Sequence, residues 1–491
     1  MNNKKICLLS FVIAMLFFLS ACFGESGDES SFADTSEESQ EQSELTEESS
    51  EEPSEESSEE LPPAFVYDDV TLSVMIGGEE RLLEFSIEDE NENGISSSFA
   101  QRIENIKTDH GISFDLICVP ENDDMATEIA SRSQSGIETD LVFFGASSFG
   151  RHAVSGLYYD LNGLEGLEKL KNDPSSQSLS VMGKLYFVTG SVCVTSYDSV
   201  YALFYNKALA ADDLYDDVRD GVWTVDRMYE YAKKASANRL SFSSPDAVFG
   251  IVSRSDDALA FMTACGEDTV QKDENGIPVR NIGKKTNTAF YEKIKSVLSD
   301  PSSSGIAENY GNWKTTYDRE KEIFFDGRAL FMPYTLSLIT REEREIKTDI
   351  GILPMPKQTA DGVYRTPTDA YSLTAAGIPT SNISRVAESC AALEALDYYG
   401  RHDVREAYFA DISSALRLSD DDVGMLKIIT ENVSFDIGSL YIDSIGGDAS
   451  PMRIYASCVT SDEAFEVLVN PSLPAYERGI EAFIEKINQI K

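Results

Sequence analysis

The chain has 491 residues, with 85 acidic against 41 basic residues and a formal net charge of −44. So strong a negative charge repels a phosphate backbone, which disfavours a nucleic-acid partner. Histidine occurs only three times, as His110, His152 and His402, which weakens hypotheses of a metal site or a histidine base. We therefore expect no nucleic-acid partner, no metal and no cofactor.

The N-terminus has the pattern of a secretory signal. Lys4 and Lys5 precede an almost wholly apolar run at residues 6–19, and two small residues then precede Cys22. A positive start, a short apolar core and a small-residue exit are typical of a signal peptide. The apolar run is shorter than the roughly 20 residues of a membrane-spanning helix. Residues 1–21 are therefore predicted to be a signal peptide.

The four residues Leu19-Ser20-Ala21-Cys22 resemble the lipobox of bacterial lipoproteins. That resemblance implies lipidation of the Cys22 sulfur and cleavage just before it. Stable anchoring takes more than one lipid chain, a condition that a multiply acylated Cys22 meets. The alternative is an ordinary secreted protein with a chance cysteine at this position.

An acidic Ser/Glu tract follows the cysteine. Residues 25–60 contain 16 acidic residues and no Lys or Arg. So polar a segment cannot bury enough apolar surface to order itself, so residues 22–64 are predicted to be a disordered tether. A partner-binding acidic tail is the alternative. The remaining residues exceed what one hydrophobic core usually covers, which predicts two lobes or domains.

Apolar runs and amphipathic segments alternate after the tether. A strand–helix–strand–helix–strand order predicts a parallel α/β sheet. The predicted strands are residues 70–77, 112–120 and 139–145, and the predicted helices are residues 98–111 and 124–136.

The same alternation continues to the C-terminus. Thr224 is a plausible N-cap for a helix at 223–235, and Gly400 is expected to lie just past the end of a helix at 381–400. Trp223, which opens the first of these helices, is expected to serve packing. The further predicted strands are residues 200–206, 328–333, 349–356 and 370–377, and a last helix is predicted at 473–490.

Five cysteines remain after Cys7 and Cys22. They are odd in number, widely spaced and without a CxxC pattern, which favours buried free thiols and leaves one disulfide open. These five are Cys118, Cys193, Cys265, Cys390 and Cys458.

Two segments resemble known sequence motifs, but each lacks a residue that its motif requires. "DENENG" at 89–94 resembles the first half of a calcium loop, but Ala100 stands where the bidentate glutamate would be needed. "GASSFG" at 145–150 misses the nucleophile elbow because Phe149 stands where that motif needs glycine. Neither segment therefore supports a metal site or a hydrolase nucleophile.

Seven segments, in order, resemble the sugar-type (family 1) extracellular solute-binding proteins of bacterial ABC importers. The most specific is "ALFYNKAL" at 202–209, which resembles the strand that enters the family's second lobe. The others are "GLYYDLNGL" (156–164), "MGKLYFVTGS" (182–191), "GVWTVDRMYEYAKKA" (221–235), "FFDGRALFMPYTLSLI" (324–339), "DIGILPMPK" (349–357) and "AYSLTAAGIPTSNISRVAESCAALEAL" (370–396).

The resemblance implies an α/β fold of the type II periplasmic-binding-protein kind, with two lobes joined by crossover strands at a hinge. By correspondence, lobe 1 would take residues 65–198 and 370–435. Lobe 2 would take residues 199–369 and 436–491.

It also implies a function without covalent chemistry. A small solute, a sugar or oligosaccharide, would bind between the lobes, and hinge closure would present it to the permease of an ABC transporter. We expect a monomer that is lipid-anchored at the outer face of a bacterial cell membrane of the Gram-positive type. The alternatives are a cell-surface lipoprotein enzyme, such as a carbohydrate hydrolase, and the same fold binding a peptide, polyamine or metal chelate.

Candidate ligand-binding residues follow from the same resemblance, with aromatic rings to stack on a sugar and polar groups to bind its hydroxyls. Tyr334 follows a strand that commonly lines the cleft, and Trp313 is a further stacking candidate. The segment 143–152 after the third strand is expected to be a loop that contributes Phe144, Ser147 and Ser148, and Asp198, Asp369 and Tyr371 lie near the predicted crossovers.

The same residue types also suit structural roles. Relatives that bind maltose-like sugars place an aromatic residue and then charged residues in the 143–152 segment, and the two serines here depart from that pattern. Phe144 and Tyr371 also suit a core position, and Asp369 also suits a turn cap.

Replacing the predicted lipidation site tests the anchor. We expect Cys22→Ala to be released from membranes into the medium, because no thiol remains to carry the lipid. Fractionation of cells into membrane and medium, followed by immunoblotting, measures this. Persistent membrane association of the variant would reject the anchor.

Overall fold

The computed structural model describes residues 61–490, except 87–93, 121–124, 238–243, 245, 311–315, 341–347 and 447–450. The chain divides into two units, residues 1–60 and 61–491. The predicted signal peptide, Cys22 and most of the predicted tether lie outside the described residues, as does Trp313.

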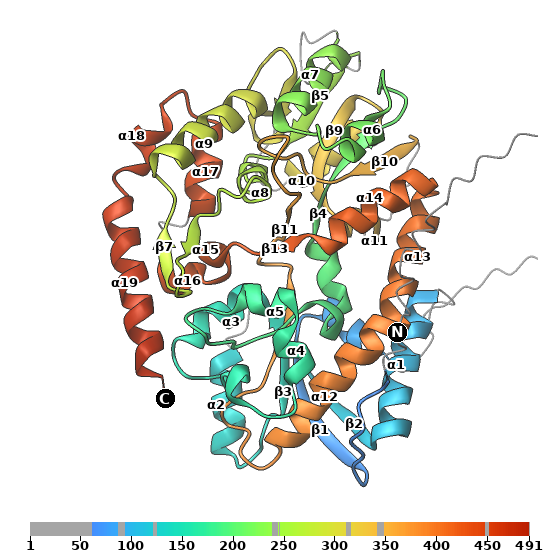
Figure 1. Ribbon diagram of the computed structural model, residues 1–491, viewed down its shortest axis with the longest axis vertical. Helices are drawn as coiled ribbons and strands as arrows, with labels where there is room; N and C mark the ends of the chain where they lie inside the picture. Colours follow the sequence, from blue (N-terminus) through green and yellow to red (C-terminus); the bar gives the residue numbers. More distant parts are fainter. Residues whose placement is uncertain are drawn as a thin grey trace, which may run out of the picture. The chain divides into compact units, whose positions relative to one another are not determined.

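A four-stranded sheet forms the centre of one α/β lobe, which we call lobe 1 (Figure 1). Its strands are β1 (Val70–Gly77), β2 (Ile112–Val119), β3 (Leu141–Gly145) and β12 (Thr374–Gly377), in the order β12-β3-β1-β2. The first three strands lie where the sequence predicts them, and β1 runs parallel to both β2 and β3. Strand β12 is shorter than predicted and pairs antiparallel with β3, so the sheet is mixed rather than wholly parallel.

Helices α1 (Gly94–His110) and α2 (Met125–Gln134) confirm two predicted helices of lobe 1. The predicted loop after β3 is wrong, because α3 (Ala146–Ala153) begins directly after Gly145. Ala146, Phe149 and Ala153 are buried at helical spacing, so this segment packs an apolar face into the core. The short helices α4 (Glu168–Asn172) and α5 (Pro174–Leu179) follow.

Gly400 does not end the helix that precedes it. α12 (Val386–Tyr399) continues through a π-helical turn at Gly400–Val404 into α13 (Arg405–Leu416). A Cβ atom on Gly400 would lie 1.9 Å from the carbonyl oxygen of Ser191. The glycine is therefore needed for a close approach between the helix and the chain beside it, and not as a helix stop.

A five-stranded sheet forms the centre of lobe 2, in the order β10-β4-β9-β5-β8 (Figure 1). Its strands are β4 (Tyr201–Asn206), β5 (Phe249–Ser253), β8 (Ser304–Ile306), β9 (Ala329–Thr335) and β10 (Ile350–Leu353). The surrounding helices are α6 (Leu214–Arg219), α7 (Val225–Ala235), α8 (Asp257–Ala264), α9 (Lys285–Leu298), α10 (Thr316–Phe325) and α11 (Ser337–Thr340).

The start of α7 agrees with its sequence. Thr224 is the N-cap, and its side-chain oxygen accepts a hydrogen bond from the backbone N–H of Arg227. Trp223 is fully buried, as its packing role requires, and its indole N–H donates to the carbonyl of Pro354 at 2.9 Å.

The chain passes between the lobes at several neighbouring segments. Val200 bridges to Thr368, and β11 (Thr366–Pro367) pairs in parallel with β13 (Val433–Ser434). These paired crossovers form the hinge region.

One carboxylate attaches α14 (Asp420–Glu431) to the lobe 2 sheet. Asp422 is buried, and it accepts hydrogen bonds from Lys207 Nζ at 2.6 Å and the Tyr215 hydroxyl at 2.6 Å. It also accepts from the backbone N–H of Ile352 in β10 and from both the N–H and the hydroxyl of Ser419. Five donors therefore converge on this side chain, and they hold the N-terminus of α14 against β4, β10 and α6.

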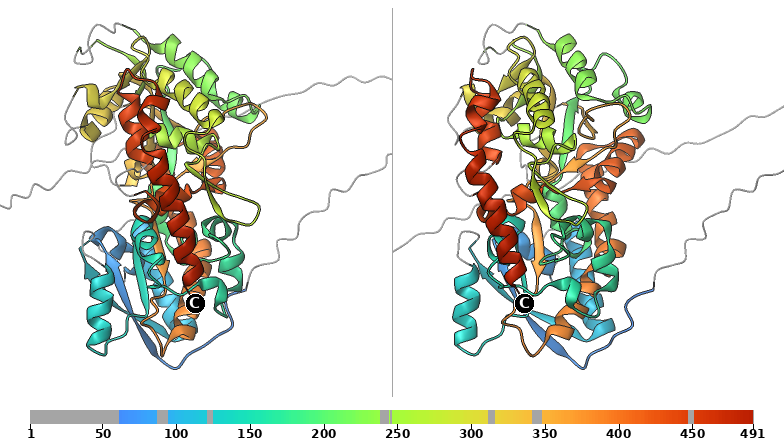
Figure 2. Two further views of the ribbon diagram at one scale, coloured as in Figure 1. Left: turned by 90° about the vertical axis from the view of Figure 1, so that its left-hand side faces the viewer. Right: turned by 60° about the vertical axis from the view of Figure 1, so that its left-hand side comes forward.

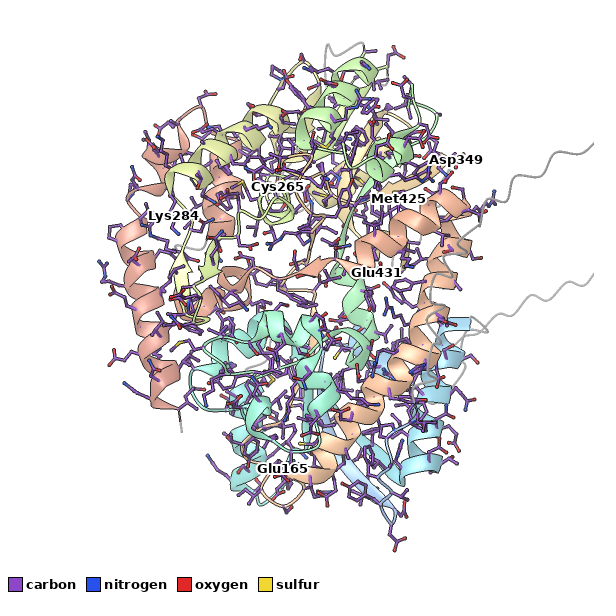
Figure 3. The ribbon with its side chains drawn as sticks, viewed as in Figure 1. Glu165, Cys265, Lys284, Asp349, Met425 and Glu431 are labelled. Atoms are coloured by element: carbon purple, nitrogen blue, oxygen red, sulfur yellow. The ribbon has the colours of Figure 1, made fainter. Side chains whose placement is uncertain are left out.

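Two segments bear on the predicted lobe ranges, which stay a prediction. Helix α14 falls within the range assigned to lobe 1 but packs against β10, and Figure 3 labels Met425 and Glu431 on α14 and Asp349 next to β10. Residues 436–446, assigned to lobe 2, form α15 (Ile437–Leu440) and α16 (Ile442–Ile445), which pack on α3 of lobe 1.

The C-terminal helices connect elements of both lobes. Tyr441 is fully buried between Phe187 of lobe 1 and Phe483 of the last helix. This helix, α19 (Leu473–Gln489), confirms a predicted element, and Figure 2 shows it extending from the level of the lobe 2 helices to that of lobe 1. Helices α17 (Pro451–Val459) and α18 (Phe465–Val469) lie between α16 and α19 in sequence.

The five cysteines of this unit are free thiols, and Cys193, Cys390 and Cys458 are buried as expected. Cys265 is half-buried and Cys118 is exposed. Within the described residues, no helix is both long and apolar enough to cross a membrane.

The Asp422 contacts predict a large cost on losing the charge. Burial acts to raise the pKa of Asp422, but the hydrogen bonds from Lys207, Tyr215 and Ser419 outweigh it and lower that pKa. We expect Asp422→Asn to destabilise the fold by about 2–4 kcal/mol, because it leaves Lys207 without its buried partner. Urea denaturation followed by circular dichroism measures this.

The neighbouring Asp421 is the matched control, because it makes an exposed ion pair with Arg219, and Asp421→Asn should change stability little. Because the folded-state pKa of Asp422 lies below its unfolded value, its contribution is present above that unfolded value. The contribution is lost as the pH falls through the folded-state value. Equal stability of the two variants would contradict the role given to Asp422.

Candidate ligand-binding site

Three strands of lobe 2 end or begin at the same edge of the sheet. β5 runs parallel to β9, so their carboxyl ends, Ser253 and Thr335, lie together. β4 runs antiparallel to β9, and its first residue, Tyr201, pairs with Thr335. Ligand sites in α/β proteins form at such edges, where neighbouring chain crossings leave a crevice.

A cavity of about 780 Å³ lies at this edge, beside the crossovers. Three groups of residues line it: the ends of lobe 2 elements, the crossover that leads into β12, and the C-terminal helices. They are Tyr201, Arg254, Asp256, Leu259, Ala260, Thr263, Tyr334, Thr335 and Ser337 from the first group, residues 367–372 from the second, and Asp436, Ser439, Ile442 and Arg453 from the third.

Arg254 contributes a buried guanidinium to the wall of this cavity. The residue is 5% exposed and follows the last residue of β5. Its Nη2 lies 3.1 Å from Asp257 Oδ1, its Nε 3.0 Å from Glu320 Oε2 and its Nη1 3.7 Å from Asp256 Oδ2. One guanidinium thus faces three carboxylates, of which only Asp256 lines the cavity.

Burial and mutual repulsion determine the protonation of these carboxylates. Burial raises the pKa of Asp257 to about 7, and Arg254 and the backbone N–H of Arg254 oppose that shift. Burial also raises the pKa of Glu320, whose two carboxylate oxygens have no hydrogen-bond partner among the described residues. Glu320 is therefore the member of the cluster that most readily keeps a proton.

Tyrosine rings supply the aromatic surface of the cavity. The guanidinium carbon of Arg254 lies 5.0 Å from the centre of the Tyr334 ring, a cation–π contact that fixes both groups. Tyr371 is 45% exposed and Tyr201 is largely buried. The cavity therefore combines flat rings with charged hydrogen-bonding groups.

Two further aspartates of the wall also serve local structure. Asp369 accepts hydrogen bonds from the N–H of Tyr371 and the hydroxyl of Ser372, so it caps the turn before β12. Asp436 accepts from the N–H and hydroxyl of Thr269. These carboxylates are positioned by the turns that they cap.

The structure brings three of the sequence-predicted site residues to the cavity: Tyr334, Asp369 and Tyr371. Phe144 does not line it, because its side chain is buried in lobe 1 over Gly77, where a Cβ atom would lie 2.3 Å from the ring. Asp198 does not line it either, since it is buried and accepts hydrogen bonds from Thr340 and Tyr408.

Ser147 and Ser148 belong to α3 and lie outside the cavity lining. The backbone N–H of Ser147 donates to the carbonyl of Ala370 at 3.2 Å, so α3 supports a wall residue without reaching the cavity itself. Trp313 lies outside the described residues.

Arg254, Asp256 and Arg453 line the cavity but are not among the site residues predicted from the sequence. The first two stand in "FGIVSRSDDALAF", where a short apolar strand ends in five polar residues before an apolar helix begins. That abrupt change at the carboxyl end of a strand is the signal that could have found them. Arg453 on α17 carries no comparable signal.

A hairpin of lobe 2 contacts lobe 1 through three hydrogen bonds. Strands β6 (Val270–Lys272) and β7 (Pro278–Arg280) form it. Lys272 Nζ donates to the carbonyls of Ser178 at 2.8 Å and Ser180 at 3.0 Å, and the N–H of Met182 donates to the carbonyl of Gly276 at 3.0 Å. We call this contact the hairpin clasp.

Metal binding finds no support in the part of the chain that the structure describes. There, no group of three or more His, Cys, Asp or Glu side chains is placed to hold a metal ion. The carboxylates around Arg254 are arranged as partners of a guanidinium.

Residues 101–395 match the sequence model of a protein family that is described as bacterial extracellular solute-binding protein. This match covers more than half of the chain, and the chain therefore belongs to that family. No curated protein sequence matches it.

Solved structures of sugar-binding proteins share the two-lobed fold. A cyclo/maltodextrin-binding protein complexed with maltotetraose has 13% identity and a TM-score of 0.56, covering 87% of this chain and all of its own. A cyclic alpha-maltosyl-1,6-maltose binding protein from Arthrobacter globiformis has 12% identity and a TM-score of 0.54, covering 84% of this chain and 99% of its own.

A sugar transporter protein from Rhizobium etli in an open conformation has 15% identity and a TM-score of 0.53, covering 86% of this chain and all of its own. At these identities the likeness shows the fold: two α/β lobes joined by crossovers at a hinge. The predicted fold class is thereby confirmed, and the family match confirms the prediction of an extracellular solute-binding protein.

The hairpin clasp predicts that Lys272 favours contact between the lobes. Lys272→Met keeps the length of the side chain and removes both hydrogen bonds from its ammonium. Because Lys272 is only half-buried, we expect a loss of about 1–2 kcal/mol in the free energy of that contact. The population should shift toward an open hinge, which small-angle scattering detects as a larger radius of gyration.

Lys285→Met, on the exposed start of α9, is the matched control and should leave the scattering curve unchanged. Superimposable curves for the Lys272 and Lys285 variants would show that the clasp does not hold the lobes together.

Proposed function

We propose that this protein captures a sugar or oligosaccharide in the cavity at the hinge and delivers it to the permease of an ABC transporter. The observation that carries the proposal is the cavity itself, whose wall combines tyrosine rings with charged side chains. Its volume lies within the range of about 300–1,000 Å³ typical of small-molecule sites. Membership of the solute-binding family supports the transport role.

The wall suits the two kinds of surface that a sugar presents. The apolar C–H faces of a sugar ring pack well on an aromatic face such as that of Tyr334. Hydroxyl groups donate to carboxylates such as Asp256 and accept from guanidinium groups such as Arg254, and charge strengthens both kinds of hydrogen bond. Binding of this kind needs no bond to form or break.

The site and the predicted N-terminus fit one arrangement in the cell. We propose a monomer held at the outer face of the membrane by lipid on Cys22, with residues 22–64 as the tether. Capture outside the cell followed by hinge closure would present the loaded form to the permease.

A thermal-shift screen tests the proposal. We expect stabilisation by maltotriose, maltotetraose or another mono- or oligosaccharide, since a ligand at 100 times its dissociation constant adds about 2.7 kcal/mol to folding stability. Amino acids and polyamines form the comparison set. Stabilisation only by that set, or conversion of a glycan to product, would overturn the proposed function.

Substitution of Tyr334 tests where the sugar binds. We expect Tyr334→Ala to weaken binding of the best sugar by about 1–3 kcal/mol, from a lost aromatic stack and hydrogen bond. Tyr334→Phe, which keeps the ring, should lose less. Isothermal titration calorimetry measures both variants.

Phe144→Leu serves as the control, because Phe144 lies in the core of lobe 1 and should affect stability rather than affinity. An unchanged dissociation constant for Tyr334→Ala would remove Tyr334 from the site.

A further inference from the structure

An arginine in a cavity wall ordinarily favours an anionic ligand, because its guanidinium matches a carboxylate or phosphate. Arg254 differs because the protein already supplies its counter-charges. Asp257 and Glu320, which are both fully buried, approach the guanidinium within 3.1 Å and 3.0 Å. Neither lines the cavity, so both hold the arginine from behind.

We propose that the Arg254 side of the cavity excludes anionic ligands and takes a neutral or cationic hydrogen-bond donor, for which Asp256 is the acceptor. This inference rests on the proposed function and specifies the ligand of the same site. Among sugars, this side of the cavity would bind neutral sugars or amino sugars more tightly than uronic acids, aldonic acids or sugar phosphates.

The charges around Arg254 give a negative balance. Arg254 brings one positive charge, against the carboxylates of Asp256, Asp257 and Glu320. With Glu320 protonated and the two aspartates ionised, the cluster carries a net charge of −1. An anion placed beside Arg254 would therefore approach a site that is already negative.

The other charged and titratable groups near the cluster do not reverse this balance. Glu308 accepts hydrogen bonds from the N–H and hydroxyl of Ser255, and it adds negative charge. Asp369, across the cavity, is a further acid, and the neighbouring Tyr201 is a buried phenol whose pKa burial raises. Arg453 is the second cation of the described wall, on α17.

Asp256 is placed to receive a donor from the ligand. Its side chain is 30% exposed, and only its Oδ2 is directed toward Arg254, at 3.7 Å. Its Oδ1 has no hydrogen-bond partner among the described residues. The exposed part of this carboxylate lines the cavity, so a ligand hydroxyl or ammonium can donate to it there.

Asp257 and Glu320 act on the ligand only through Arg254, so they are positioning residues. They also link selectivity to pH, since burial raises the pKa of Asp257 to about 7 and raises that of Glu320 as well. Because Glu320 already holds a proton, Asp257 is the carboxylate that takes one up as the pH falls, and the cluster becomes less negative. Exclusion of anions should therefore weaken at low pH and strengthen at high pH.

The test compares one sugar in different charge states. Calorimetry measures binding of maltotriose, of its aldonic acid with a carboxylate at the reducing end, and of its uronic acid with a carboxylate at the non-reducing end. At pH 8 we expect at least one acid to bind ten or more times more weakly than maltotriose. At pH 5.5 this ratio should fall several-fold, although both ligand carboxylates remain ionised.

Variants assign the effect to the cluster. Asp256→Asn should weaken maltotriose binding about tenfold or more and reduce the discrimination against acids, because it removes both the acceptor charge and the repulsion. Asp257→Asn, which mimics the protonated side chain, should flatten the pH dependence of the ratio. Lys285→Met, on the exposed start of α9 and outside the cavity lining, should leave the discrimination in place. Circular dichroism confirms that each variant is folded.

The outcomes separate this inference from the function on which it rests. Acids that bind as tightly as maltotriose at pH 8, or an unchanged ratio in Asp256→Asn, would overturn the inference while leaving sugar capture intact. If the sugar screen finds a tighter oligosaccharide, that sugar and its acids replace maltotriose. Failure of every sugar in every charge state would overturn the proposed function, and with it this inference.

Discussion

The site depends on the direction of three strands. Because β5 and β9 run parallel, their carboxyl ends lie at one edge of the lobe 2 sheet, and β4 begins at that edge because it runs antiparallel to β9. The chain also crosses between the lobes there, where Val200 bridges to Thr368. Strand direction thus brings Tyr201, Arg254 and Tyr334 to the crossovers, and the cavity follows from that arrangement.

Two buried carboxylates show how the surroundings give one chemical group opposite roles. Asp422 receives five hydrogen bonds, so its charge is stabilised and it fastens α14 to the lobe 2 sheet. Glu320 accepts no hydrogen bond among the described residues and shares the guanidinium of Arg254 with two aspartates, and burial raises its pKa, so its protonated form is favoured. Hydrogen-bond donors, more than depth of burial, separate a fixed structural charge from one that responds to pH.

The sequence identifies elements whose apolar pattern is continuous. Strands β1, β2, β3, β4 and β9 lie within two residues of the predicted positions, because each is a short apolar run with a clear end. Helix α3 escapes prediction because two serines and a glycine interrupt its apolar face. Gly400 was wrongly predicted to lie past a helix end. A glycine is needed there because the helix closely approaches Ser191, which is distant in sequence.

The site is less predictable than the fold for a related reason. Tyr334, Asp369 and Tyr371 could be proposed because they stand at a strand end and a crossover, which local sequence reveals. The balance of charge around Arg254 is hidden, because Glu320 lies on α10 and meets the arginine only in the folded chain. Such pairings depend on three-dimensional contact, and a single sequence does not display them.

The edge strand β2 carries a feature with a practical consequence. It lies at the outer end of the lobe 1 sheet, and Cys118 on it is exposed, whereas three of the other described thiols are buried and Cys265 is half-buried. Among the described thiols, Cys118 would therefore react first with a maleimide dye under mild conditions. The natural sequence thus offers a ready attachment point for a fluorophore, against which a second dye placed in lobe 2 could report opening and closing of single molecules.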